Sequence, residues 1–197
     1  MIVENNIQVI KPDQFKCLSK TLYALGNVEL LNTKTIAVAG SRKIDSKSTT
    51  WLQQAIADLP KDWTVVSGLA LGADAIAHQS ALDNDLKTIA VLPSGIGNIT
   101  PRTNIPIAKE IIKNNGLLLS EYPFKQGIKS NKQYIDRNKI IIDISNSLLV
   151  PQFDKRSGTR HTVDFAKKAN KLIIIQDADY SGNQYIINDK GYKTFIK

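Results

Sequence analysis

The sequence predicts an α/β protein with an open, Rossmann-like sheet that is mostly parallel and is flanked by helices on both faces. Short apolar runs rich in β-branched residues recur along the chain, and they lack the alternation of a half-exposed strand. Such continuous runs are typical of strands that are covered on both faces. Segments with helical spacing lie between them, and this alternation of strand and helix indicates βαβ units with right-handed crossovers.

Six of the apolar runs are predicted to be the strands of this sheet. Each has four or five residues, a length that fits a buried strand better than a helix. The runs cover residues 35–39, 64–67, 88–92, 117–120, 147–150 and 172–176.

The segments between the strands are predicted to be helices, and several carry end signals. Asp45 or Ser46 can cap the first helix, and Asn104 precedes the Ile105-Pro106 start of the third. Gly116 follows the third helix, a position where glycine commonly ends a helix. The predicted helices cover residues 46–59, 73–82, 105–114, 137–145 and 159–169.

The two ends of the chain are less regular than its centre. Residues 1–34 are predicted to be an N-terminal extension packed on the core, with one or two helical turns at 12–18 and a turn at Gly26-Asn27. Residues 35–197 then form a single Rossmann-like domain. Near its end, QYIIN and YKTFI flank Asp189-Lys190-Gly191, a pattern that predicts a small C-terminal hairpin.

The composition is that of a globular protein with a basic charge balance. Of the 197 residues, 42% are hydrophobic and 22% are charged, and no apolar run reaches the length needed to span a bilayer. The N-terminus lacks a signal-peptide pattern and Cys17 is the single cysteine, so we expect a cytoplasmic protein without disulfides. The net charge of +8 suits a polyanion such as nucleic acid, although solubility alone also explains it.

The first candidate site is Gly40-Ser41-Arg42, directly after the first predicted strand. In an open α/β sheet, ligands bind at the carboxyl ends of the strands, where helix N-termini present free N–H groups. Glycine admits a phosphate to the backbone, the serine hydroxyl can donate to it, and arginine offers a bidentate fork. A tight turn with a solvated Arg42 is the alternative. The GxGxxG dinucleotide fingerprint is absent from the sequence.

The second candidate site runs from Ser67-Gly68 to Gly72 and Asp74 at the next strand-to-helix junction. Two glycines four residues apart, followed by a helix start, suit a backbone cradle for an anion. Asp74 and His78 are four residues apart, but neither a third histidine nor a partner cysteine is present to complete a metal site. We therefore expect Asp74 to cap the helix, and we expect neither a metal nor a cofactor.

Further anion-binding candidates follow the later strands. Ser94-Gly95 belongs to a glycine-rich loop that lacks the G-x-S-x-G pattern of a hydrolase. The next loop carries Lys129 and Lys132 close to Tyr134, and cations interleaved with aromatic rings suit single-stranded nucleic acid. A solvated loop is the alternative there. The remaining candidates are Arg137-Asn138, at a helix start, and Ser157-Gly158-Thr159, at another strand-to-helix junction.

The order and spacing of these motifs resemble the DNA-processing protein A (DprA/Smf) family, of which the chain corresponds to the Rossmann-like core. The resemblance covers about residues 22 to 195. It rests on these runs, in chain order: YALGNVELL, IAVAGSR, VVSGLALGADAIAHQSAL, TIAVLPSGIG, LLLSEYP, RNKIIIDISNSLLV and SGTRHTVDFAKKA.

The resemblance implies a non-enzymatic protein that binds single-stranded DNA, dimerises, and helps load a RecA-type recombinase, with natural transformation as the best-known setting. It implies that Arg42 is the main phosphate contact and that Gly68, Gly72 and Asp74 build the pocket floor. By the same resemblance, Arg137-Asn138 holds the rim. Either Lys129 or Lys132 contacts DNA, and Tyr134 stands where relatives have phenylalanine.

The chain departs from the family pattern at several points. The Arg-Asn-Arg motif of the family appears here as Arg137-Asn138-Lys139. The family also has an acidic residue followed by alanine before its Ser-Gly motif, and residues 151–153 replace that pair here. The extra N-terminal and winged-helix segments of many relatives are not in this sequence, so a core-only form is expected.

Two other function classes use a similar fold. Phosphoribohydrolases of the lysine-decarboxylase-like type carry PGGxGTxxE, but Thr162 stands here where that motif has its glutamate. Without this general acid/base, the hydrolase is less favoured. A nucleotide sensor would use the same cradle without catalysis.

Overall fold

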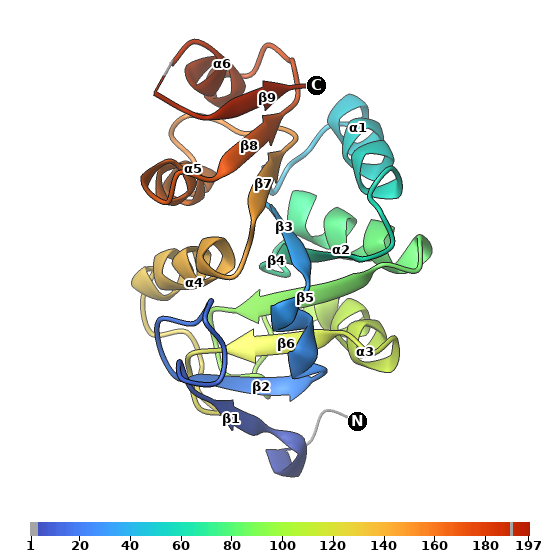
Figure 1. Ribbon diagram of the computed structural model, residues 1–197, viewed down its shortest axis with the longest axis vertical. Coiled ribbons are helices and arrows are strands. Elements are labelled where there is room, and N and C mark those ends of the chain that lie inside the picture. Colours follow the sequence, from blue (N-terminus) through green and yellow to red (C-terminus); the bar gives the residue numbers. More distant parts are fainter. Residues whose placement is uncertain (1–3, 190) are drawn as a thin grey trace.

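The computed structural model describes residues 4–189 and 191–197 (Figure 1). Within these residues one sheet of nine strands has the order β1-β2-β6-β5-β4-β3-β7-β8-β9. The strands are β1 (Gln8–Ile10), β2 (Leu22–Gly26), β3 (Lys34–Val38), β4 (Trp63–Ser67), β5 (Lys87–Leu92), β6 (Leu117–Ser120), β7 (Ser147–Val150), β8 (Leu172–Ile175) and β9 (Thr194–Ile196).

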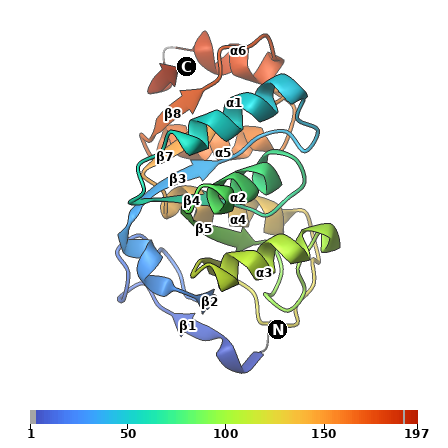
Figure 2. The same cartoon turned by 90° about the vertical axis from the view of Figure 1, so that its right-hand side faces the viewer.

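Helices cover both faces of this sheet. The helices α1, α2 and α3 lie on one face, and α4 and α5 lie on the other (Figure 2). Their bounds are α1 (Ser46–Ala57), α2 (Ala73–Asp83), α3 (Ile105–Lys113), α4 (Lys132–Asp143), α5 (Thr159–Lys168) and α6 (Ser181–Ile187). Short 3-10 helices span Glu4–Asn6, Val28–Asn32 and Arg102–Asn104. Each described helix is too short or too polar to cross a membrane.

The chain reverses its direction of travel along the sheet at β3. From β3 it proceeds through β4 and β5 to β6 on one side, and it then returns to β7 on the other side of β3, with parallel pairing throughout. The loops that follow β3 and β7 therefore leave the same edge of the sheet in opposite directions. A crevice opens at such a topological switch point.

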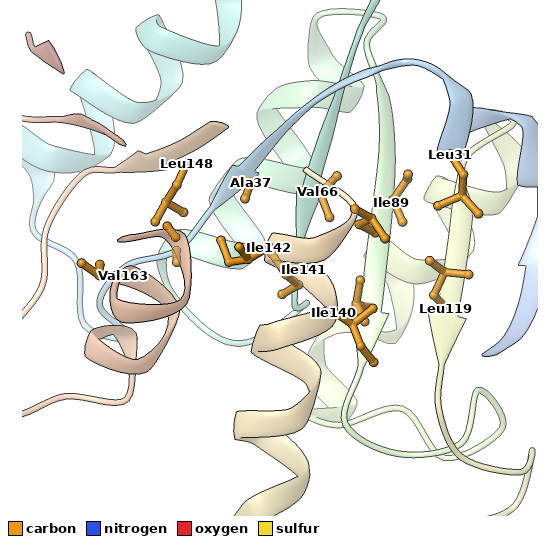
Figure 3. Close-up of a cluster of buried hydrophobic side chains, with 14 of the residues drawn as sticks. Leu31, Ala37, Val66, Ile89, Leu119, Ile140, Ile141, Ile142, Leu148 and Val163 are labelled. Atoms are coloured by element: carbon orange, nitrogen blue, oxygen red, sulfur yellow. The ribbon is translucent and has the colours of Figure 1, made fainter. Parts of the chain in front are cut away.

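The apolar runs are continuous because successive residues of a strand pack on opposite faces. On β3, Ile36 and Val38 belong to the hydrophobic cluster under α1 and α2, whereas Ala37 packs under α4. Figure 3 shows this second cluster, in which Ile141 and Ile142 of α4 meet the sheet. Each strand thus contributes to two cores, as the sequence pattern predicts.

The six predicted strands are confirmed to within one residue at each end. The five predicted helices are also present, and Asp45 caps α1 by accepting a hydrogen bond from the Ser48 N–H at 2.8 Å. The start of α4 differs, because the helix begins at Lys132, five residues before the predicted start at 137. The prediction that Asn104 marks the start of α3 is correct, although its side chain does not cap the helix.

The predicted C-terminal hairpin is wrong. Residues 181–187 form α6, and β9 pairs with β8 in parallel, so the segment is a further βαβ crossover. Ile186 is fully buried in the core beneath this helix. The Asp189 side chain accepts a hydrogen bond from the Gly191 N–H at 2.8 Å. The turn signal in the sequence therefore marks the end of a helix rather than the tip of a hairpin.

The N-terminal segment adds two strands that the sequence pattern did not reveal. Residues 22–26 form β2, which pairs antiparallel with β6, and β1 extends the sheet beyond it. The expected helical turns at 12–18 are two isolated hydrogen-bonded turns. Gly26 ends β2 at a φ of +108°, and a Cβ there would stand 2.2 Å from the Gly116 carbonyl oxygen. Only glycine fits that close approach.

We predict that Leu148→Ala, on β7, lowers the free energy of unfolding by about 2–5 kcal/mol, because it leaves a cavity in a fully packed core. Urea unfolding monitored by circular dichroism measures the change. Val9→Ala is the control, since Val9 is 53% exposed and its truncation changes the free energy by at most about 0.5 kcal/mol. Equal effects of the two substitutions would contradict the described core.

Candidate functional site

A cavity lies at the switch point, where the loops after β3 and β7 diverge. Its volume is about 530 Å³. Four segments build it: the β3–α1 loop, the β4–α2 loop, the first turns of α4 and the β7–α5 loop. We call it the main cavity, and it is lined by Val38, Ala39, Gly40, Ser41, Arg42, Lys43, Ala70, Asp74, Tyr134, Arg137, Asn138, Ile141, Asp154, Ser157, Gly158, Thr159 and Thr162.

Backbone contacts hold the β3–α1 loop in place. The Ser41 N–H donates to the Gln152 carbonyl at 2.7 Å, and the Ser41 carbonyl accepts from the Ala73 N–H at 3.0 Å. Thr159 Oγ1 donates to the Gly40 carbonyl at 3.0 Å and ties the loop to α5. We expected the Ser41 hydroxyl to donate to a ligand, but it already bonds within its own loop. Its Oγ lies 3.0 Å from both the carbonyl oxygen and the backbone nitrogen of Lys43.

Arg42 leaves this fixed loop and stays exposed at the mouth of the cavity. Its guanidinium carbon lies 5.5 Å from the centroid of the Tyr134 ring, a cation–π contact that restrains both side chains. Tyr134 comes from the first turn of α4 and is half-buried. The structure therefore brings together an accessible cation and an aromatic ring that lie 92 positions apart in the sequence (134 − 42).

Arg137 is the buried counterpart of Arg42, with only 5% of its surface exposed. From α4 it reaches across the carboxyl edge of the sheet, where Nη1 donates to the Gly68 carbonyl and to the Val91 carbonyl, the latter at 3.0 Å. Its Nε donates to Asn138 Oδ1 at 2.9 Å. A Cβ on Gly68 would stand 1.8 Å from Arg137 Nη1, so glycine at this position makes room for the guanidinium.

Asp74, at the start of α2, supports the buried charge of Arg137. Burial raises the pKa of Asp74, while the positive charge of Arg137 works against that rise. For Arg137 the same two effects act in the opposite sense, since burial lowers its pKa and Asp74 opposes the fall. Each ion thus reduces the cost of burying the other.

His78 lies one turn further along α2 and is fully buried. The Thr88 hydroxyl donates to the Val65 carbonyl, so it accepts from His78 Nδ1 at 2.7 Å, which sets the tautomer with the proton on Nδ1. No partner for Nε2 lies within the described part of the chain. Burial, and then the charge of Arg137, lower the pKa of His78 to about 3. The ring is therefore neutral, as expected for a histidine bonded beside the site.

The start of α5 presents a helix N-terminus and the Ser157 hydroxyl to the main cavity. The first N–H groups of a helix have no partner within the helix, and they attract anions. The Ser157 hydroxyl is buried and lacks a hydrogen-bond partner among the described residues. A Cβ added to Gly158 would meet nothing within 4 Å, so the space in front of this residue is open. These features suit an anion at this end of the cavity.

A smaller cavity adjoins the main one and shares part of its wall. Its volume is about 160 Å³. Arg42, Ala70, Tyr134 and Arg137 line both cavities. We call this the second cavity, and its other lining residues are Gly68, Leu71, Pro93, Thr100 and Pro101.

The β4–α2 loop between the two cavities adopts an unusual backbone held by Asn104. Leu69 has a φ of +58° and Gly72 a φ of +72°, both in the left-handed region. The buried Asn104 side chain donates to the Leu69 carbonyl at 2.9 Å and to the Ala70 carbonyl at 3.0 Å. Asp74 accepts from the Ala70 N–H at 3.2 Å. Three side-chain contacts thus fix the loop that presents Ala70 and Leu71 to the cavities.

Several predicted site residues lie outside both cavities. Ser67 and Ser94 are fully buried, and their hydroxyls donate to the carbonyls of Val38 and Asn98. A Cβ on Gly95 would stand 1.9 Å from the Pro123 carbonyl oxygen, so that glycine serves packing.

The two candidate lysines and Gly72 also lie outside the cavities. Lys132 is exposed and pairs with Asp136 at 2.6 Å, one turn along α4. Lys129 is exposed on the preceding loop, and neither lysine lines a cavity. Gly72 supplies the positive φ at the start of α2, where a Cβ would stand 2.4 Å from the Ser41 carbonyl oxygen.

Sequence reasoning missed some residues of the site. Lys43 adds a third cation to the main cavity and Asp154 adds a carboxylate. Hydrogen bonds from the Arg156 N–H and the Ser181 hydroxyl lower the pKa of Asp154, so it stays charged. The position of Lys43 directly after Arg42 could have indicated a second cation at the site. Nothing in the sequence indicated that Leu71 or Asn104 would lie at the site. The described residues contain no group of three or more His, Cys, Asp or Glu side chains that could hold a metal ion.

A model of a family described as DNA recombination-mediator protein A matches residues 10–196 of the chain. The chain belongs to this family. DNA processing protein DprA of Streptococcus pneumoniae is 34% identical over 154 residues, which cover 78% of this chain and 54% of that relative. The chain spans about half the length of the first curated relatives it matches.

Solved structures of DNA processing protein A share the fold. The X-ray structure of the S. pneumoniae protein has a TM-score of 0.86 at 25% identity and covers 98% of this chain and 72% of that one. The Helicobacter pylori protein, reported for a unique single-stranded DNA binding mode, has a TM-score of 0.85 at 28% identity. That match covers 95% of this chain and 90% of the H. pylori chain.

For this DprA-family chain we predict that acid weakens the fold through His78. Its folded pKa of about 3 lies below its ordinary value of 6.5, so the unfolded state binds the proton more tightly. This contribution to stability is complete above pH 6.5 and is lost as the pH falls from 6.5 toward 3, at up to about 1.4 kcal/mol per pH unit. The free energy of unfolding, measured in urea at pH 7, 6 and 5, gives this slope.

His78→Gln removes the titrating group, so the free energy difference between this variant and the wild type shrinks as the pH falls. His161→Gln is the matched control, since His161 is exposed. A wild-type slope that both variants reproduce would contradict the assignment to His78.

We also predict that Asn104→Ala lowers the free energy of unfolding by about 1–3 kcal/mol, because the buried Leu69 carbonyl and the partly buried Ala70 carbonyl lose their donor. Asn114→Ala is the control: the Asn114 amide also donates to a carbonyl, but the residue is exposed. The control is expected to cost at most about 0.5 kcal/mol. Chemical denaturation compares the two, and equal losses would show that Asn104 is not a clamp.

Proposed function

We propose that this chain binds single-stranded DNA through its sugar–phosphate backbone at the main cavity, as a recombination mediator of the DprA type that does not cut the strand. The observation that carries the proposal is the exposed Arg42 guanidinium beside the Tyr134 ring, at a cavity that is also lined by Ser157, whose hydroxyl has no partner among the described residues. The binding mode reported for the H. pylori relative supports the same ligand class.

The main cavity suits a phosphate better than a neutral ligand. Arg42, Lys43 and Arg137 bring three cations to it, against the two carboxylates of Asp74 and Asp154. The Asp74 charge is partly balanced by Arg137, and Asp154 accepts hydrogen bonds from the Arg156 N–H and from the Ser181 hydroxyl of α6. The exposed positive charge of Arg42 and Lys43 is therefore free to meet a phosphate, and the N-terminus of α5, which lines the same cavity, favours negative charge.

Sequence-independent binding follows from this geometry. Phosphates are the same at every step of a strand, so contacts to them carry no base preference. Tyr134 offers a ring face on which a base can stack, and such stacking is tolerant of sequence because every base has a π-face. Binding is expected to weaken with salt as counterions are released, with a slope of about −0.7 for each phosphate that a cation neutralises.

The partners that the family resemblance implies are part of the proposal. We infer that the chain acts as a homodimer and delivers its strand to a RecA-type recombinase. A charged strand held by its backbone leaves most bases accessible to a second protein. Size-exclusion chromatography with light scattering tests the dimer, and co-sedimentation with a RecA-type recombinase on single-stranded DNA tests the partner.

A nucleotide sensor is the second candidate, because the same donors also suit a mononucleotide phosphate. The phosphoribohydrolase is less favoured, since the buried Thr162 lines the main cavity where the hydrolase motif has its glutamate. Binding of free nucleotides and release of base from a nucleoside monophosphate separate these two functions from strand binding.

We predict that Arg42→Ala weakens binding to oligo-dT by about 1–2 kcal/mol, since it removes a charge-assisted but solvent-exposed contact. The slope of log K against log salt should also fall by about 0.7, the share of one phosphate on a single strand. Fluorescence anisotropy with oligo-dT, duplex DNA and mononucleotides over a salt series gives both values.

Lys109→Ala is the matched control for this experiment. Lys109 is exposed on α3, so the substitution changes the net charge equally without touching the main cavity. Identical isotherms for Arg42→Ala and Lys109→Ala would remove Arg42 from the site. Mononucleotide binding tighter than strand binding would favour the sensor.

A further inference from the structure

Arg42 stands on a segment that makes few backbone contacts of its own. Residues 42–44 form an irregular stretch between β3 and α1, and no backbone–backbone hydrogen bond to any of them occurs among the described residues. The Ser41 hydroxyl bonds Lys43, but this contact lies within the loop itself. Ile44 packs against the hydrophobic cluster under α1 and α2. The position of the Arg42 backbone therefore depends chiefly on what holds the two ends of this segment.

Gln152, on the β7–α5 loop, bonds both ends of this segment. Its carbonyl accepts a hydrogen bond from the Ser41 N–H at 2.7 Å, and its side-chain Oε1 accepts one from the Asp45 N–H at 2.9 Å. Ser41 and Asp45 lie on either side of residues 42–44 in the sequence. A single residue thus brackets the segment that carries Arg42, and the second of its two bonds depends on a side-chain oxygen.

The backbone of Gln152 is itself held from the other side by Asn183 of α6. Asn183 is fully buried, its Oδ1 accepts from the Phe153 N–H at 3.2 Å, and its Nδ2 donates to the Pro151 carbonyl at 2.9 Å. The Phe153 carbonyl accepts a further bond from the Gly182 N–H at 3.1 Å. Because both neighbours of Gln152 are bonded to α6, its side chain extends from a backbone that is fixed.

Asp45 connects this bracket to the start of α1. Its carboxylate accepts hydrogen bonds from the Ser48 N–H at 2.8 Å and from the Tyr180 hydroxyl, and these contacts hold its side chain. Its own N–H belongs to the peptide unit that joins Ile44 to Asp45 and ends the Arg42 segment. Without the Gln152 oxygen, this N–H has no hydrogen-bond partner in the described part of the chain.

We propose that Gln152 is a positioning residue for strand binding: its side chain holds the β3–α1 loop so that the Arg42 guanidinium stays beside the Tyr134 ring. The inference rests on the proposed function. Gln152 does not line the main cavity, so it acts through the loop rather than on the strand. Ordering a loop on binding costs free energy, and a loop that is already held in its binding geometry reduces that cost.

The test uses Gln152→Met, which keeps the length of the side chain and removes the acceptor oxygen. Gln53→Met is the matched control, because Gln53 is exposed on α1 and lines neither the main nor the second cavity. The side-chain bond of Gln152 is exposed, so its loss is expected to leave the fold intact. Urea unfolding verifies that both variants fold.

We expect Gln152→Met to weaken oligo-dT binding about two- to tenfold in fluorescence anisotropy, the range that corresponds to the loss of one hydrogen bond. The slope of log K against log salt should keep its wild-type value, because the cations are unchanged. In the Arg42→Ala background the same substitution should have a smaller effect, since the side chain that it positions is gone. Gln53→Met should leave both the affinity and the slope unchanged.

A spectroscopic measurement on the free protein tests the position of Arg42 directly. The ring current of Tyr134 shifts the NMR signal of the Arg42 Nε–H, because the ring centroid lies 5.5 Å from the guanidinium carbon. Tyr134→Leu gives the signal of an Arg42 that has no ring beside it. We expect Gln152→Met to move the signal toward that value, and we expect Gln53→Met to leave it at the wild-type position.

Three results would overturn the inference and leave the proposed function standing. They are wild-type affinity of Gln152→Met for oligo-dT, equal effects of this substitution in the wild-type and Arg42→Ala backgrounds, and an Arg42 signal that it does not move. If the wild type itself does not bind oligo-dT, the proposed function fails, whereas the NMR signal still reports whether Gln152 holds Arg42. The two failures are therefore distinguishable.

Discussion

The site depends on one buried charge at the edge of the sheet. Arg137 crosses from α4 to the carboxyl ends of β4 and β5 and bonds the carbonyls of Gly68 and Val91. A buried guanidinium is costly unless it is bonded and balanced, and here two carbonyls and the charge of Asp74 do both. The arginine thereby joins a helix of one face to the strand ends and to α2 of the other face.

This constraint explains residues that have no contact with solvent. Gly68 leaves space for the guanidinium, and the neutral His78 avoids a second positive charge beside it. Asn104 holds the neighbouring loop from a third direction. Arg137 and the β4–α2 loop are thus held in place, and Arg42 and Tyr134 make their cation–π contact beside them. Both residues of this pair line the two cavities.

The cavities owe their position to topology rather than to a single motif. The β3 and β7 loops diverge because the chain reverses its direction along the sheet between them. The β3 loop supplies the exposed Arg42, the β7 loop leads into the N-terminus of α5, and α4 contributes the Tyr134 ring. Two cavities that share Arg42, Tyr134 and Arg137 in their walls therefore lie side by side.

Local sequence patterns reveal most of the parallel sheet, because strands such as β3 and β5 are covered on both faces and read as continuous apolar runs. They do not reveal β2, whose pairing with β6 is between segments about 95 positions apart, nor α6, whose apolar residues were too few to separate a helix from a strand. Whether these segments become a strand or a helix depends on the part of the protein against which each one packs. Propensity alone does not contain that information.

The same division holds for the site. The sequence by itself determined the fold class and the strand ends that border the main cavity, because strand ends are local features. It also singled out Arg42, Tyr134 and Arg137 as candidates by residue type. The tertiary structure alone decided that Arg137 is buried while Arg42 is exposed, and that Leu71 borders a second cavity. Burial and juxtaposition arise from contacts between distant segments, and residue type and spacing do not specify them.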